Sequence, residues 1–230
     1  MTGTYTWGNG TYTGETNERG GPHGQGVFEF ASGTRYEGQW KDGQKHGQGV
    51  FEFASGGRYE GQWKDGESHG HGVEEYEQGS LHMRYEGQWK DGKKHGQGVM
   101  ELADGSRYDG EWKDGKMHGQ GVYEWGPGEW EGNRYEGQWK DGERHGQGVM
   151  EYADGERYEG QQKAGLFHGR LFTTRRDGSS FTTLWENGKL VSSEDLQSMS
   201  RDELTLELLK LRERVNGLSK SDQREDSEPN

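Results

Sequence analysis

The sequence has no cysteine and no isoleucine, and only three of its 230 residues are proline. The absence of cysteine excludes disulfides, cysteine-ligated zinc and thiol catalysis. Eight valines and thirteen leucines remain, and eleven of the leucines lie at or beyond residue 166, so a conventional aliphatic core is excluded over most of the length. No long apolar run is present, and we therefore expect neither a signal peptide nor a membrane-spanning segment.

Positive charge is also in short supply. The chain has 28 basic and 41 acidic residues, which gives a formal net charge of −13. An excess of carboxylates repels phosphate groups. We therefore expect no nucleic-acid partner, and contact with an anionic membrane is disfavoured.

Glycine and aromatic residues are abundant instead: 43 glycines, nine tryptophans, eleven tyrosines and seven phenylalanines. Collagen would need glycine at every third position with abundant proline. A disordered chain would have few aromatic residues. Because each aromatic side chain can bury about 150–250 Å², the sequence predicts a folded protein with an aromatic core.

One phrase dominates the chain. It reads Tyr-Glu-Gly-Gln-Trp-Lys-Asp-Gly at residues 36–43 and returns at intervals of 23 to 27 residues. The copies begin at Tyr12, Tyr36, Tyr59, Tyr85, Tyr108, Tyr135 and Tyr158, and a half copy begins at Phe181. The longer intervals contain insertions at 77–83 and 127–133, which we interpret as enlarged turns between units. Such a period is typical of repeat architectures.

Each copy predicts a β-hairpin. Tyr36, Gly38 and Trp40 alternate with polar residues, so one face of the first strand is aromatic. Residues 41–45 contain turn chemistry, and residues 46–53 form the return strand. Glycine is normally unfavourable in strands, so its recurrence indicates rings that lie across the backbone. We predict a single curved layer of hairpins in which aromatic rings pack over glycines.

The pattern Tyr-x-Gly-x-Trp-x-x-Gly-x-x-His-Gly-x-Gly resembles the MORN repeat family over roughly residues 5–190. The resemblance implies an all-β fold, an elongated, single-layer, twisted antiparallel sheet with a groove along one face. The opening unit, residues 12–24, carries an extra loop residue and an Asn17-Glu18 pair. In this it resembles the first unit of radial spoke head proteins of motile cilia.

Three regions follow: a repeat sheet at 1–192, an amphipathic helix at 193–218 and a disordered acidic tail at 219–230. Ser200 and Glu203 form a capping box before an apolar seam. The seam consists of Leu204, Leu208, Leu211, Val215 and Leu218. Because two heptads are short for an isolated coiled coil, we expect the seam to dock on this chain or on a partner, with a homodimer as an open alternative.

Sites for chemistry are not predicted. Seven histidines recur at equivalent positions, but neighbouring hairpins are about 10 Å apart, too far for two of these histidines to share a zinc ion. The Gly-x-Gly phrases precede strands, whereas phosphate loops precede helices. The carboxylates repeat evenly on polar faces. We therefore expect no catalytic residue, no metal and no cofactor.

The aromatic stripe is the remaining candidate site, both as core and as a partner-binding groove. The candidate partner-binding residues are Tyr36, Trp40, Tyr59, Trp63, Tyr85, Trp89, Tyr108, Trp112, Tyr135 and Trp139, with Leu204, Leu208, Leu211 and Val215 on the helix.

The sequence thus favours a non-enzymatic protein–protein interaction scaffold. By resemblance, we expect a cytoplasmic structural component of the ciliary or flagellar axoneme, in the radial spoke head, with other spoke-head subunits as partners. The alternatives are a cytoskeletal or cortical adaptor that binds a partner helix, and a phosphoinositide-binding membrane tether.

Overall fold

The structure is a computed structural model that describes residues 2–195. The described residues form 17 β-strands and no helix. Of the helix predicted at 193–218, residues 193–195 belong to the last strand, and the rest lies outside the described residues, as does the whole of the predicted tail. The described residues divide into two compact units, residues 2–143 and residues 144–195.

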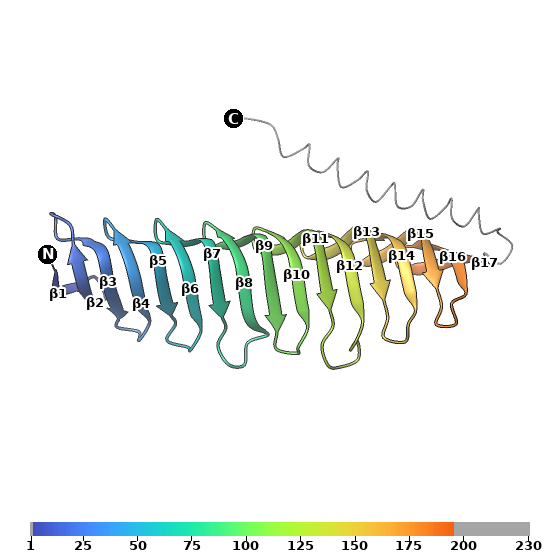
Figure 1. The fold of residues 1–230 in the computed structure, drawn as a ribbon, viewed down its shortest axis with the longest axis horizontal. Helices are drawn as coiled ribbons and strands as arrows, with labels where there is room; N and C mark the ends of the chain where they lie inside the picture. Colours follow the sequence, from blue (N-terminus) through green and yellow to red (C-terminus); the bar gives the residue numbers. More distant parts are fainter. Residues whose placement is uncertain (1, 196–230) are drawn as a thin grey trace, which may run out of the picture. The chain divides into compact units, whose positions relative to one another are not determined.

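Twelve strands make up the first unit (Figure 1). They are β1 (Thr2–Trp7), β2 (Gly10–Thr16), β3 (Pro22–Phe30), β4 (Arg35–Lys41), β5 (Gln44–Glu52), β6 (Arg58–Lys64), β7 (Glu67–Glu75), β8 (His82–Lys90), β9 (Lys93–Leu102), β10 (Arg107–Lys113), β11 (Lys116–Glu124) and β12 (Arg134–Lys140). Each strand pairs antiparallel with the next one in sequence.

The second unit has five strands with the same sequential antiparallel pairing. They are β13 (Glu143–Glu151), β14 (Arg157–Lys163), β15 (Leu166–Thr174), β16 (Ser180–Glu186) and β17 (Lys189–Asp195). Strand β17 pairs Asp195 with Phe181, so the last copy is a complete hairpin and the sheet continues three residues beyond the expected boundary at 192. In both units the predicted all-β, single-layer fold of antiparallel hairpins is confirmed.

The hairpin turns follow from the Asp-Gly pairs. Asp42 has a φ of 48° and Gly43 a φ of 84°, and positive φ recurs at both positions of the later turns, the last two of which have Ala164 and Asn187 in place of aspartate. Two central residues with positive φ form the type I′ turn, whose twist matches the strands that it joins. Asp-Gly is a favoured pair for this turn, which explains why the repeat is so regular.

A β-bulge adjoins the Asp-Gly turns. Gly38 pairs with Gly49, but Trp40 pairs with Lys45, so the return strand carries extra residues. Gly47 sits in this bulge with a φ of 59°. The N–H of Gln48 donates to the side-chain oxygen of Gln39 at 2.8 Å, which replaces a missing ladder bond. Gly47 is therefore required for its conformation, whereas the sequence suggested space for a ring.

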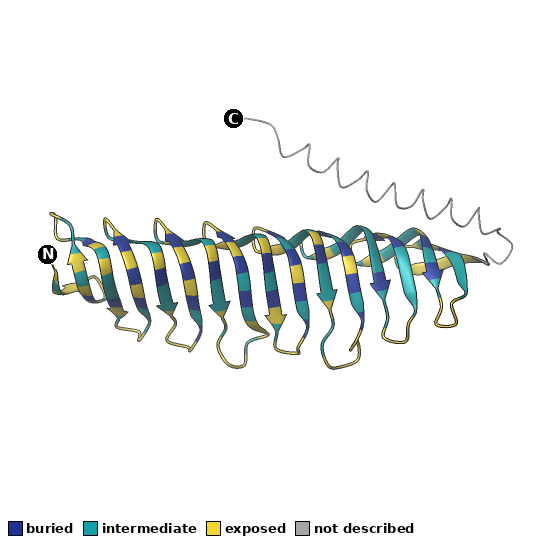
Figure 2. Cartoon of the chain, in the orientation of Figure 1, coloured by how far each residue is buried: buried dark blue, intermediate teal, exposed yellow. Residues whose placement is uncertain are grey.

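The strand glycines do carry rings, as predicted. A Cβ added at Gly49 would lie 2.3 Å from the hydroxyl of Tyr36, and one at Gly38 would lie 2.5 Å from the Cα of Gly49. Such distances leave no room for any side chain. Figure 2 shows the result, with buried positions alternating with exposed ones along the strands of the first unit.

Edge-to-face aromatic pairs connect successive hairpins of the first unit. The ring of Tyr36 lies 5.1 Å from that of Trp40 in its own strand and 5.3 Å from that of Trp63 in the next hairpin. Trp63 also donates its indole N–H to the carbonyl of Gly49 at 3.1 Å. This arrangement recurs from Tyr12 to Trp139, so the core of the unit is one continuous aromatic ladder.

The second unit departs from the ladder at Gln162, which stands where the repeat has tryptophan. Its side chain is 3% exposed, and neither amide atom has a hydrogen-bond partner. Nearby, Tyr158 stacks on Phe167, which in turn contacts Trp185. Ring packing is thus retained with different residues, at the cost of a buried amide.

Candidate functional site

The ten tyrosine and tryptophan residues proposed from the sequence all lie in the aromatic ladder. Each is at most 8% exposed. They form the inner layer of the aromatic face. This packing role explains why the same residues recur in successive copies. Their contact with a partner stays a prediction, and Leu204, Leu208, Leu211 and Val215 lie outside the described residues.

The hydroxyl groups of the ladder tyrosines are held by backbone hydrogen bonds. The hydroxyl of Tyr36 donates to the backbone oxygen of Gln39 at 2.9 Å, and Tyr59 and Tyr85 make the equivalent bonds. Burial raises the pKa of Tyr36 far above its usual range. These rings therefore stay neutral and structural.

A second set of rings lies further along the return strands and is less buried. We call it the outer aromatic row: Phe30, Phe51, Phe53, Tyr76, Tyr123 and Trp125. The rings of Phe51 and Phe53 lie 4.8 Å apart, and Phe53 is 43% exposed. The other members are half-buried.

The outer aromatic row is absent from the residues proposed above. The sequence does contain a signal for this row, because alternation places Phe51 and Phe53 on the same face of the strand as Gly49. Alternation identifies a face of a sheet, but it does not tell which ring lies beneath another.

Lys45 and Lys94 lie over rings of the ladder. The Nζ of Lys45 lies 3.9 Å from the centre of the Trp63 ring and 4.4 Å from that of Phe51. Burial lowers the pKa of Lys45 to about 8. The aromatic face thus has ammonium groups held against rings, an arrangement stabilised by the ring quadrupoles.

Glu74 interrupts the aromatic face, at the position where the preceding repeat has Phe51. Its carboxylate accepts a hydrogen bond from the Tyr76 hydroxyl and lies 3.9 Å from the Nζ of Lys94. Lys94 also donates to the Tyr76 hydroxyl at 2.6 Å. Burial, the largest cause, raises the pKa of Tyr76 and lowers that of Lys94. This half-buried cluster makes the middle of the face chemically distinct.

The opposite face is polar and internally paired. Arg58 lies 2.6 Å from Glu60, and the equivalent arginine of almost every repeat contacts the acid two residues later. The pairs are Arg35–Glu37, Arg58–Glu60, Arg84–Glu86, Arg107–Asp109, Arg134–Glu136 and Arg157–Glu159. The charges of these six guanidinium groups are therefore balanced by acids of the same strand.

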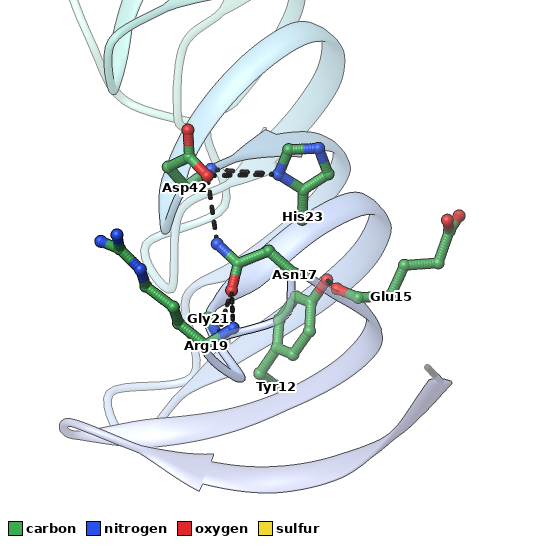
Figure 3. Close-up of polar contacts among 7 residues, drawn as sticks. All are labelled: Tyr12, Glu15, Asn17, Arg19, Gly21, His23 and Asp42. Carbon is green, nitrogen blue, oxygen red and sulfur yellow. Dashed lines mark hydrogen bonds and ion pairs between the residues drawn. The ribbon is translucent and has the colours of Figure 1, made fainter.

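The opening loop is tied to the next hairpin (Figure 3). The side-chain oxygen of Asn17 accepts from the backbone N–H groups of Arg19 and Gly21. Its amide donates to Asp42 at 3.1 Å, and the Asp42 carboxylate lies 3.5 Å from His23. Asn17 thus closes the loop and links it to the turn of residues 41–44.

The same histidine-to-turn contact recurs at His46–Asp65 and His69–Asp91, within 4 Å. These histidines pack against the next turn. Among residues 2–195 no three histidine or acidic side chains gather as a metal site, and no helix there is long and apolar enough to cross a membrane.

The repeat geometry agrees with a family comparison. The sequence profile of the MORN repeat matches residues 1–12, 18–35, 36–58, 59–81, 85–107, 108–130 and 135–157, more than half of the chain. The chain belongs to the MORN repeat family. No curated protein sequence matches it.

The solved structures that the chain matches include the following two domains. The SAS-4 (dCPAP) TCP domain of Drosophila melanogaster, in complex with a proline-rich motif of Ana2, is 9% identical, with a TM-score of 0.43 over 74% of this chain and 88% of that chain. The TCP10 domain of Danio rerio CPAP, in complex with a STIL peptide, is 14% identical, with a TM-score of 0.28 over 76% of this chain and 96% of that chain. At these values no functional conclusion follows from the likeness.

Proposed function

We propose that this MORN-repeat chain is a non-enzymatic scaffold that binds another protein along the outer aromatic row. The observation that carries the proposal is the division of the aromatic face into two layers. The ladder rings are buried and hold the sheet together, whereas Phe53 and its neighbours leave ring surface exposed. Exposed aromatic surface on a rigid support is typical of protein-binding sites.

The spacing of the row suits an elongated partner. Equivalent rings in successive hairpins are separated by two strand spacings, about 10 Å. A partner segment that lies across the strands can therefore place apolar side chains at regular intervals. The cluster of Glu74, Tyr76 and Lys94 breaks the apolar surface and would fix the register of that segment.

The setting that we favour is the radial spoke head of the ciliary axoneme, in the cytoplasm, with other spoke-head subunits as partners. Membership of the MORN family supports a repeat scaffold. The opening loop supports the narrower assignment, because Asn17 organises a closure that the later repeats lack in sequence.

Affinity capture from an axonemal extract tests this function. The bait is the full chain, compared with a variant that carries Phe53→Ser and Trp125→Ser. We expect the wild type to retain spoke-head proteins and the variant to lose them while melting at a similar temperature. A control with Gln48→Ser and Gln97→Ser on the exposed polar face should behave as wild type. Capture that is equal for all three proteins would contradict the proposed binding face.

A further inference from the structure

The two enlarged turns expose apolar side chains at one edge of the first unit. Leu81 and Met83, around the junction of the β7–β8 turn with β8, are 81% and 58% exposed, and Trp130, in the β11–β12 turn, is 50% exposed. Burying these side chains would be favourable. The shorter turns of the unit present residues such as Ala54 and Gly105 at the corresponding places.

Both enlarged turns are ordered by their own backbone bonds. In the first, the N–H of Tyr76 donates to the carbonyl of Met83 at 3.0 Å. In the second, the N–H of Trp125 donates to Asn133 and that of Asn133 donates to Trp130, both at 3.1 Å. The exposed side chains are thus held on preorganised backbone, which lowers the entropy lost on binding.

The β9–β10 turn, residues 103–106, joins the two enlarged turns into one surface. The N–H of Ala103 donates to the carbonyl of Leu81 at 2.9 Å. On the other side, the N–H of Gly126 donates to the hydroxyl of Ser106 at 3.0 Å. Figure 1 shows the three turns next to one another along the lower edge in that view.

The charge of this surface has one sign. Residues 76–83, 103–106 and 125–133 contain four carboxylates and no lysine or arginine. The carboxylates belong to Glu77, Asp104, Glu129 and Glu131, and all four residues are exposed. The surface therefore combines apolar anchors with a negative field, which attracts and orients cationic partners.

We propose that these three turns form a docking surface for a basic amphipathic helix of another protein. The two enlarged turns are four strand spacings apart, or about 19 Å. An α-helix with a rise of 1.5 Å per residue spans that distance in about 13 residues. The apolar side of the helix covers Leu81, Met83 and Trp130, and its lysines or arginines face the carboxylates.

The chain's own C-terminal segment is a poorer match. Residues 196–230 contain eight acidic and six basic residues, which adds negative charge to a negative edge. The surface adjoins the outer aromatic row at the half-buried Tyr76 and Trp125. Its exposed anchors, Leu81, Met83 and Trp130, are not members of the row, so the surface can serve a second partner whether or not the row binds the first.

Binding of a defined peptide to the full chain tests the proposal. The probe is an 18-residue helical peptide of leucine, lysine and alanine with leucine on one side, and its counterpart has glutamate in place of lysine. Titration calorimetry should show saturable binding of the lysine peptide, weakened by added salt, and none of the glutamate peptide. The triple variant Leu81→Ser, Met83→Ser and Trp130→Ser should bind at least about tenfold more weakly, as expected for the loss of interface anchors.

The control is Phe53→Ser, which removes an exposed ring from the outer aromatic row and should leave the affinity for the lysine peptide unchanged. Circular dichroism melting verifies that each variant is folded. Equal binding to wild type and triple variant would overturn the proposal, since the peptide would then follow overall charge alone. So would a concentration-dependent dimer of the free chain that the triple variant abolishes, because the occupant would then be a second copy.

Discussion

At the scale of single residues, the fold depends on glycines that leave room for the large rings of neighbouring positions. Gly38 and Gly49 give up a side chain so that Tyr36 can lie across the strands and bond to Gln39. Gln39 in turn supplies the oxygen that the bulge at Gly47 needs. Glu111 performs the same task for Gln120 at 2.8 Å, so an acceptor oxygen is all that the position requires.

We expect Gly38→Ala to destabilise the first unit by about 3 kcal/mol, the upper end for overpacking. The new Cβ would lie 2.5 Å from the Cα of Gly49 and 2.6 Å from the carbonyl oxygen of Gln48, and backbone cannot move aside. Urea unfolding followed by tryptophan fluorescence measures the change. Gly21→Ala is the control, because its nearest atoms lie at 3.5 Å or more. Equal stability of the two variants would contradict this packing.

Gln162→Met should stabilise the second unit by about 1 kcal/mol. The substitution keeps the side chain's size and removes a buried amide that has no hydrogen-bond partner. Thermal unfolding measures the gain. The control is Gln48→Met, which makes the same change at an exposed side chain and should have little effect on stability. A loss of stability at Gln162 would indicate that the amide is satisfied in solution.

The stability of the first unit should rise with pH between about pH 8 and the onset of tyrosine ionisation near pH 10. Burial lowers the pKa of Lys45 from 10.5 to about 8, so in this window the unfolded chain binds more protons than the folded one. Above the window the trend reverses, since burial raises the pKa of the ladder tyrosines. Lys45→Met should flatten the rise, as measured by urea unfolding at several pH values. An unchanged slope would exclude Lys45 as its source.

At the scale of elements, the hairpins could be predicted and the bulges could not. Alternation in residues 36–40 and the Asp42-Gly43 pair specify two strands and a turn from local sequence alone. The bulge depends on a hydrogen bond from the backbone N–H of Gln48 to the side-chain oxygen of Gln39 across the ladder, which no local pattern encodes. For the candidate site, the sequence identified the aromatic face. The sequence did not separate the ladder from the outer aromatic row. That separation depends on how deeply each ring is buried, and burial is determined by tertiary packing.

Trp89→Ala should destabilise the first unit by about 3–5 kcal/mol, the usual cost for a buried aromatic side chain. The ring of Trp89 contacts those of Tyr59 and Tyr85 at 5.2 Å, and its indole N–H donates to Gly72. The variant thus removes the link between two hairpins. Differential scanning calorimetry measures the loss, with the exposed Trp130→Ala as the matched control. A Trp89→Ala protein that melts like the wild type would show that the ladder is not the core.

At the scale of the whole molecule, composition and charge follow from the repeat. A layer of hairpins has little interior, so the chain needs few aliphatic residues and relies on rings that cover glycine backbone. The polar face carries many charges, but its arginines lie beside acids of the same strand. The net charge of −13 is therefore an excess spread over paired groups and acidic turns. This distribution bears on the membrane-tether alternative.

We expect no binding to vesicles that contain phosphatidylserine or phosphoinositide at physiological salt. Lipid recognition of this kind needs clusters of free lysine or arginine, worth about 1 kcal/mol for each residue near the surface. Arg35, Arg58 and Arg84 are instead held by Glu37, Glu60 and Glu86. Vesicle flotation checks the wild type, and the triple variant Glu37→Gln, Glu60→Gln and Glu86→Gln is the informative partner. Neutralising the three acids removes these partners of Arg58 and Arg84 and leaves Arg35 beside Glu52 alone, at 3.5 Å. The variant therefore has more free guanidinium charge on one face, so it should float with anionic vesicles and lose that binding in high salt. Tight binding by the wild type would favour the tether over the scaffold, because it would mean that a membrane surface can displace the paired carboxylates.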